Sequence, residues 1–161
     1  MTTLASPPDA HSRDEAELAD VIARLRRAMR RAARVTDPGN SLSVAQLELL
    51  SCLAENPGAR PSRIARLLRL APNSVTTLVN GLRKQDLITR ADGSDDRRTV
   101  SLTLTPAGER AVRQWRTTNT AILRGALNEL HPAWRHLLTA ALPALSELVH
   151  AIDTLAEPSE A

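Results

Sequence analysis

The sequence contains no tyrosine and no phenylalanine, and Trp115 and Trp134 are its only large aromatic residues. Single-stranded nucleic acids bind by stacking on aromatic side chains, so this scarcity argues against that class of function. The single cysteine, Cys52, excludes an intrachain disulfide and a cysteine-based zinc cluster. It also gives no reason to assign an oxidising compartment.

No apolar run approaches the length that spans a membrane, and the N-terminal stretch MTTLASPPDAHS lacks the apolar core of a signal peptide. We therefore expect a cytoplasmic protein with no membrane partner. Patterns for a nucleophile elbow, a phosphate-binding glycine loop and a dinucleotide site are also missing. The four histidines are scattered without a metal-ligand pattern, so we expect no enzyme activity, no cofactor and no metal site.

The 161 residues suffice for one domain, or for one small domain with extra helices, and for a substantial buried core. The formal net charge is only +3, but arginine supplies most of the basic side chains. This balance indicates an electropositive patch rather than a protein that is basic throughout.

Helical spacing of apolar residues predicts a long first helix after an N-terminal segment, 1–11, that we expect to be disordered. Ser12 and Glu15 have the spacing of a capping box at its start. Arginines at positions 24, 26, 27, 30, 31 and 34 fall on the face opposite the apolar stripe. That arginine face is either solvated and paired with acids, or in contact with phosphates.

Three shorter helices follow the break at DPGN. Ser43 and Gln46 predict a second capping box, and Asn56, Pro57 and Gly58 end the helix that it starts. The segments PSRIARLLRL and PNSVTTLVNGLRKQ are two helices separated by only a few residues, which is the spacing of a helix-turn-helix.

The fourth predicted helix has a narrow apolar face formed by Val75, Leu78, Val79 and Leu82. The opposite face is polar but nearly uncharged, which suits a helix that reads the major groove of DNA better than an ordinary solvated helix. The residues that we expect to contact DNA from this helix are Asn73, Ser74, Thr76, Thr77, Asn80 and Lys84.

A β hairpin is predicted next, because Val100, Leu102 and Leu104 alternate with polar residues after the apolar pair Leu87 and Ile88. Its tip, ADGSDDRR, is either a solvated turn or a rigidly held probe for a negatively charged partner. Thr105 and Pro106 predict the start of a fifth helix. A sixth is expected from Pro132 to about Leu155, and Pro143 should kink or split it.

The run LAPNSVTTLVNGLRKQDLITRADGSDDRRTVSLTLTPAG, with this order of elements, resembles the MarR family of bacterial transcription regulators. The resemblance implies a homodimer that binds double-stranded, pseudo-palindromic operator DNA, most often as a repressor, and that a small-molecule effector releases. It makes the fourth helix the recognition helix and the hairpin a DNA-binding wing, formed by Arg90, Asp96, Arg97 and Arg98. In this family pattern Arg98 enters the minor groove and Asp96 steadies it. Ser62 and Arg63 are expected phosphate contacts.

The expected fold is mainly α with a small β hairpin, a winged helix-turn-helix flanked by long dimerisation helices. The expected divisions are 1–11, the dimerisation helix 12–37, the DNA-binding domain 42–105, the C-terminal dimerisation helices 106–156 and a tail, 157–161. Outer helices with more apolar surface than one small domain can cover favour the dimer.

Four positions depart from the family pattern. Arg69 and Asp86 stand where turn glycines are usual and where φ above zero is expected, and neither Ala71 nor Arg60 can cap a helix as Ser or Thr would. These departures leave the tilt of the recognition helix open. The alternative function is a winged-helix protein-interaction module that does not bind DNA. For Cys52 we expect a structural role rather than redox sensing, because no adjacent base lowers its pKa.

Overall fold

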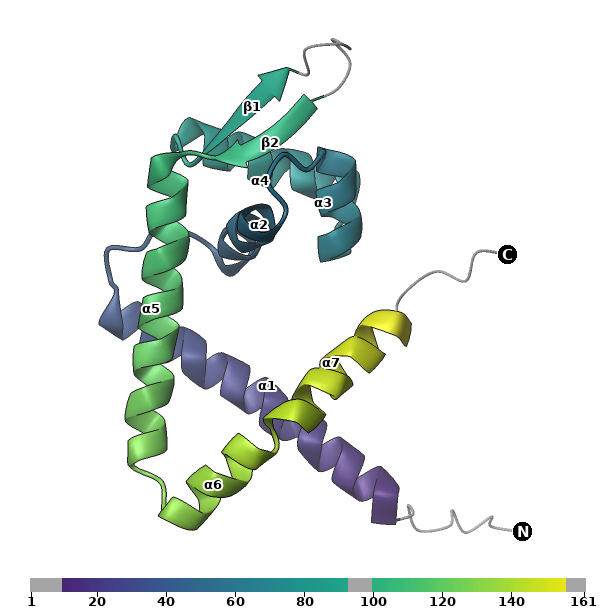
Figure 1. Cartoon of the computed structure of the whole chain (residues 1–161), viewed down its shortest axis with the longest axis vertical. Helices are drawn as coiled ribbons and strands as arrows, with labels where there is room; N and C mark the ends of the chain where they lie inside the picture. The colour runs from purple at the N-terminus through teal and green to yellow at the C-terminus, as the bar shows by residue number, and fades with distance from the viewer. Residues whose placement is uncertain (1–9, 93–99, 156–161) are drawn as a thin grey trace, which may run out of the picture. The chain divides into compact units, whose positions relative to one another are not determined.

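The computed structural model describes residues 10–92 and 100–155. The predicted fold class is confirmed, because the described chain is helical apart from one antiparallel hairpin (Figure 1). The elements are α1 Ala10–Thr36, α2 Val44–Glu55, α3 Pro61–Leu68, α4 Pro72–Lys84, β1 Ile88–Asp92, β2 Val100–Leu104, α5 Pro106–Asn128, α6 Pro132–Ala140 and α7 Leu142–Leu155. The chain forms two compact units, Met1–Thr120 and Ala121–Ala161.

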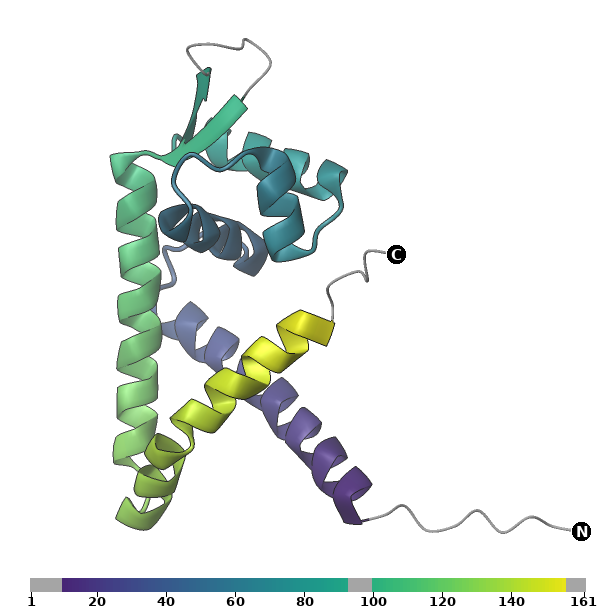
Figure 2. The same ribbon diagram turned by 45° about the vertical axis from the view of Figure 1, so that its right-hand side comes forward.

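A winged helix-turn-helix forms the core of the first unit. Helices α2, α3 and α4 pack on one another, and the hairpin packs against all three (Figure 2). The largest fully buried side chains are Leu49, Leu50, Leu53, Ile64, Leu82, Leu102 and Val75. Burial of this apolar surface holds α4 on one side and leaves its other side exposed.

Both ends of α2 follow the sequence prediction. The Ser43 hydroxyl accepts a hydrogen bond from the Gln46 N–H, and the Gln46 side chain accepts one from the Ser43 N–H, so the capping box is confirmed. The helix ends at Glu55, with Asn56 as its C-cap. Gly58 then turns the chain with a φ of 77°, a conformation that glycine adopts without steric cost.

The loop after α2 adds a short third line of backbone pairing to the hairpin. Ala59 forms an isolated antiparallel bridge with Leu102. Two backbone hydrogen bonds make it, from Gly58 N to Leu102 O at 3.0 Å and from Leu102 N to Ala59 O at 3.0 Å. The base of the hairpin is therefore tied to the helix-turn-helix on the side of β2.

The helix α1 begins earlier than the sequence predicts. It starts at Ala10, so Ser12 lies inside the helix and the capping box expected between Ser12 and Glu15 is wrong. Alanine is the best helix former, and the helical backbone continues through Ala10 and His11 before Ser12 is reached.

The junction between the hairpin and α5 depends on Thr105. Its hydroxyl donates to the Asp86 carbonyl at 2.6 Å and accepts from the Gly108 N–H at 3.1 Å. The predicted start of α5 at Pro106 is thus confirmed. Val112, one turn further along, is buried in the same core as the winged helix-turn-helix.

The second unit contains the end of α5, with α6 and α7. The predicted sixth helix is split at Ala141 into these two helices, with Pro143 as the second residue of α7, where a missing backbone N–H costs little. Arg135 holds the end of α5, because its guanidinium donates to the carbonyls of Leu127 at 3.0 Å and Asn128 at 3.2 Å.

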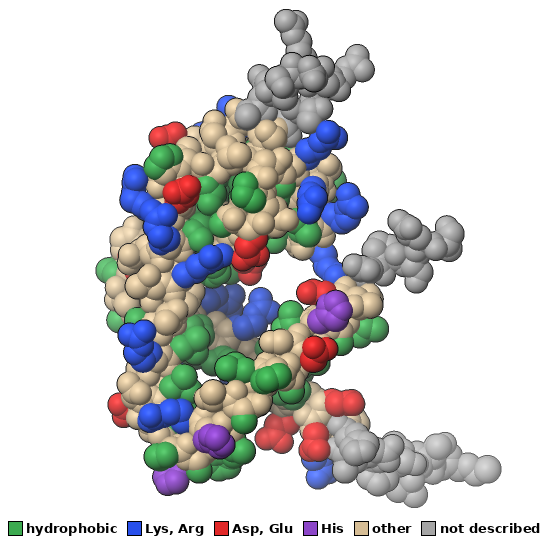
Figure 3. Space-filling model, in the orientation of Figure 1, with side chains coloured by type: hydrophobic (Ala, Val, Ile, Leu, Met, Phe, Trp, Pro, Cys, Tyr) green, Lys and Arg blue, Asp and Glu red, His purple; other side chains and the backbone are tan. Residues whose placement is uncertain are grey.

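Large apolar side chains remain exposed on α1, α6 and α7. No residue of α6 or α7 is buried, and Trp134 and Val149 are 63% and 60% exposed. Figure 3 shows hydrophobic side chains on the surface over these two helices. On α1, Leu18, Val21 and Leu25 are between 44% and 53% exposed. Among the described helices, none has the length and hydropathy needed to cross a lipid bilayer.

Candidate nucleic-acid interface

The helix α4 presents two chemically different faces. Val75, Val79 and Leu82 are buried against the core. A rotation of 100° per residue puts the exposed side chains of Asn73, Thr76, Thr77, Asn80 and Lys84 on the opposite side, with exposed Ser74 at its edge. The polar face expected from the sequence is therefore brought together on one helix.

Two threonines on this face use their hydroxyl protons locally. Thr76 donates to the Pro72 carbonyl at 2.9 Å, and Thr77 donates to the Asn73 carbonyl at 3.0 Å. Their oxygens keep only acceptor capacity, and each carries a methyl group. These two side chains are suited to accepting a hydrogen bond or contacting a thymine methyl, and they have no free donor for a base.

The two asparagines on this face differ in their bonding. The Asn73 side-chain oxygen accepts a hydrogen bond from the Ser74 N–H at 2.9 Å. Asn80 is exposed and forms no hydrogen bond with any other residue in the described part of the chain. Asn80 therefore offers both an amide donor and a carbonyl acceptor, the pair of groups that recognises adenine.

The stem of the hairpin is regular. Its five residue pairs run from Ile88 with Leu104 at the base to Asp92 with Val100, and Ile88 and Leu102 are buried. Arg90 lies on β1 with an exposed side chain. The other expected wing residues, Asp96, Arg97 and Arg98, lie outside the described residues, so their roles stay predictions.

The expected phosphate contacts lie near the beginning of α3. Ser62 and Arg63 are both exposed, and Arg63 donates a long hydrogen bond of 3.4 Å to the Asn56 side-chain oxygen. Arg60 is the N-cap and makes no side-chain capping bond, and the same holds for Ala71 at α4, as the sequence predicts. Proline stands at the first position of both helices, where its missing N–H costs nothing.

The two turns that border α4 have the backbone conformation expected from the missing glycines. Arg69 has a φ of 52° and Asp86 a φ of 55°. Aspartate tolerates this left-handed region better than most residues, whereas for arginine it costs about 1 kcal/mol. The Asp86 carbonyl is also held by the Thr105 hydroxyl.

Sequence reasoning missed three residues that position this surface. Thr105 joins the turn after α4 to the start of α5, Gly108 allows α5 to approach the Leu87 backbone, and Ala59 pairs with β2. The only local signal was the run TPAG after a strand, which predicts a helix start but no contact across the fold.

Cys52 is buried on α2, and this supports the structural role expected for it. Burial raises the pKa of the Cys52 thiol, the negative charge of Glu55 raises it further, and Arg63 opposes both. A raised pKa leaves less of the reactive thiolate at neutral pH. Among the described residues, no group of three or more His, Cys, Asp or Glu side chains is arranged to hold a metal ion.

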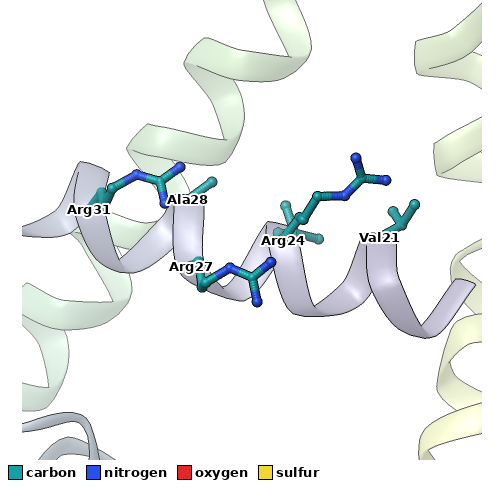
Figure 4. A pocket seen from close by; sticks show the side chains of 6 residues that line it. Val21, Arg24, Arg27, Ala28 and Arg31 are labelled. Atoms are coloured by element: carbon teal, nitrogen blue, oxygen red, sulfur yellow. The ribbon is translucent and has the colours of Figure 1, made fainter. Parts of the chain in front are cut away.

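The arginine face of α1 is exposed. Arg24, Arg27 and Arg31 line an open hollow on this helix together with Val21 and Ala28 (Figure 4). None of the three forms an ion pair with another residue that the structure describes. Acids of the same chain therefore do not neutralise this face, and its contact with phosphate stays a prediction.

Known proteins share this sequence pattern. Residues 42–100 match the model of the MarR family. The HTH-type transcriptional repressor MdtR from Bacillus subtilis (strain 168) is 34% identical over 65 residues, which cover 40% of this chain and 42% of that protein. The uncharacterized HTH-type transcriptional regulator Mb0904 from Mycobacterium bovis is 26% identical over 141 residues, or 88% of this chain and 96% of that protein.

Solved structures share the fold over nearly their whole length. A proposed transcriptional regulator from Pseudomonas aeruginosa PA01 has a TM-score of 0.75 and 26% identity, and the match covers 89% of this chain and 98% of that one. FabT from Streptococcus pneumoniae, solved in complex with DNA, has a TM-score of 0.67 and 19% identity, with 88% and 99% covered. The matched residues, the full-length relatives and the winged fold agree, and the chain belongs to the MarR family of helix-turn-helix transcriptional regulators.

Proposed function

We propose that this protein regulates transcription by binding double-stranded, pseudo-palindromic operator DNA. The observation that carries the proposal is the exposed face of α4, where Asn80 has a free amide near Thr77 and Lys84 and where the helix contains no acidic residue. Amide side chains on a helix of this kind pair with base edges in the major groove. Residues 42–105 would then contact DNA, and 12–37 and 106–156 would form the dimer.

Binding of the purified protein to its own genomic DNA, titrated with salt and followed by sequencing of the retained fragments, tests this function. We expect a related set of retained sequences and an affinity that falls steeply with salt, because bound arginines and lysines release counterions from DNA. If no duplex is bound even at low salt, the alternative of a winged-helix protein-interaction module is the better account.

The wing is tested by replacing Arg98 with alanine. If Arg98 enters a narrow minor groove, we expect weaker binding to most sites and a salt dependence that is flatter by about one unit of slope or less. The measurement is binding to several operators over a range of salt concentrations, with Arg113→Ala on α5 as a control of equal charge. Parental affinity of Arg98→Ala at every salt concentration would mean that the loop is only a solvated turn.

We propose a homodimer formed through α1, α5, α6 and α7, because exposed apolar side chains on α1, α6 and α7 have no partner in the described part of the chain. Sedimentation at micromolar concentration should show a dimer. Val149→Glu places a charge among these apolar side chains and should shift the protein to monomer, whereas His150→Glu, at the next exposed position, should not. A parent that sediments as a monomer contradicts the proposal.

We further propose that the protein acts in the cytoplasm as a repressor and that a small-molecule effector releases it from DNA. The family resemblance supports this, and so does the name of the Bacillus subtilis relative as a transcriptional repressor. MarR-family members are transcriptional regulators, which are not enzymes. A reporter placed behind the retained operator should be expressed more strongly when the protein is deleted.

A further inference from the structure

A row of four arginines runs along α3 and into the turn that follows it. Arg60, Arg63, Arg66 and Arg69 are spaced by three residues, and all four are exposed. Side chains three apart on a helix are neighbours on its surface. Figure 3 shows basic side chains gathered over this helix, and we call these four residues the α3 arginine row.

Acidic side chains do not neutralise this row. The ion pairs found among the described residues join Arg113 to Glu109 and Arg116 to Glu55. Glu55, at the end of α2 that precedes α3, is therefore held by Arg116 at 3.0 Å. Arg63 donates instead to the neutral side chain of Asn56. The row keeps a concentrated positive charge next to the helix-turn-helix.

The last member of the row occupies a position where the fold favours glycine. The Arg69 backbone is left-handed, with φ 52° and ψ 42°, and its N–H bonds to the carbonyls of Ala65 and Arg66. These backbone bonds end α3, and they need no particular side chain. Asp86 has a similar φ, but its residue type tolerates it. A strained residue with no local structural reason points to a role for the side chain.

The row ends where the recognition helix begins. Leu70 N bonds to Ala65 O at 2.9 Å, Ala71 is the N-cap of α4, and α3 packs directly on α4. Arg69 is thus fixed two residues before α4. We propose that the α3 arginine row binds the phosphate backbone of duplex DNA beside the groove that α4 enters. This proposal rests on the proposed function, and it assigns the row a sequence-independent share of the binding.

The role of Arg69 is tested by comparing Arg69→Gly with Arg69→Lys in the full-length protein, on duplexes of random sequence. Arg69→Gly removes the charge and relieves the backbone, so it should unfold at the same or higher denaturant concentration and yet bind DNA less tightly. Loss of one phosphate contact lowers the salt slope by about 0.9, so the affinity gap from the parent should shrink about threefold to fourfold between about 50 and 200 mM salt. Arg69→Lys should keep the parental slope.

The rest of the row is tested by the triple variant with glutamine at 60, 63 and 66, and Arg113→Gln serves as the control for charge alone. We expect the triple variant to lose about 0.9 of salt slope for each contact removed, and the control to match the parent. If Arg69→Gly and the triple variant keep the slope of the control while the parent binds DNA, the row does not contact phosphate and the proposed function still stands. If the parent binds no duplex, the proposed function fails, and this inference fails with it.

Discussion

Replacing Gly108 with alanine should destabilise the protein by about 3 kcal/mol, the upper end of what overpacking of a core costs. A Cβ at this position would overlap the Leu87 carbonyl oxygen and lie 3.1 Å from the Leu87 carbonyl carbon. The same oxygen accepts the Thr105 N–H at 3.1 Å, so it cannot move away without loss of a hydrogen bond. Denaturant unfolding of the purified variant measures the change.

Gly81, in the interior of α4, is the matched control for this prediction. An added Cβ there would meet only the flexible end of the Gln46 side chain, at 3.4 Å. Alanine at Gly81 should therefore stabilise the helix by about 0.5 to 1 kcal/mol, because glycine loses more conformational freedom on folding. Equal unfolding midpoints for Gly108→Ala and the parent would show that α5 does not approach the Leu87 backbone as closely as the structure has it.

Replacing Asn80 with alanine should cost about 1 to 3 kcal/mol of discrimination at one base position of the operator and little elsewhere. Asn80 is the asparagine of α4 whose amide and carbonyl are both free. Asn73→Ala should have a smaller effect on base choice, since the Asn73 oxygen already accepts the Ser74 N–H. Binding of each variant to a panel of single-base operator changes makes the comparison.

The control for Asn80→Ala is Gln114→Ala, which removes an exposed side-chain amide from α5. It should bind the whole panel like the parent. If Asn80→Ala weakens all operators equally, Asn80 contributes general affinity and reads no base. If it changes none of them, α4 does not enter the groove with this face.

Local patterns in the sequence predicted most of the elements, because each depends on neighbouring residues. The capping box of Ser43 and Gln46, the alternation along β2 and the helix start after Thr105 all concern contacts within a few positions. Pro143 likewise splits the last helix through its own missing N–H. The capping box at Ser12 failed because a cap motif cannot show whether helical backbone already precedes it.

The candidate DNA surface was predicted in outline and not in its ranking. Rotation by 100° per residue was enough to place Asn73, Thr77 and Asn80 on one face, away from the buried Val75 and Val79. Periodicity gives no side-chain rotamers, so it could not show that both threonine hydroxyls bond backward or that Asn73 bonds to Ser74. Only the structure therefore distinguishes Asn80 as the amide that is free on both sides.

The sequence by itself determined the secondary structure, the polar face of α4 and the family, because helical and strand periods and short motifs are local properties of the chain. The tertiary structure decided what brings distant segments together. Thr105 reaches Asp86 across 19 positions, Gly108 lies against Leu87, and Ala59 pairs with Leu102. These contacts are short in space and long in sequence, so packing of the whole core sets them and no local pattern encodes them.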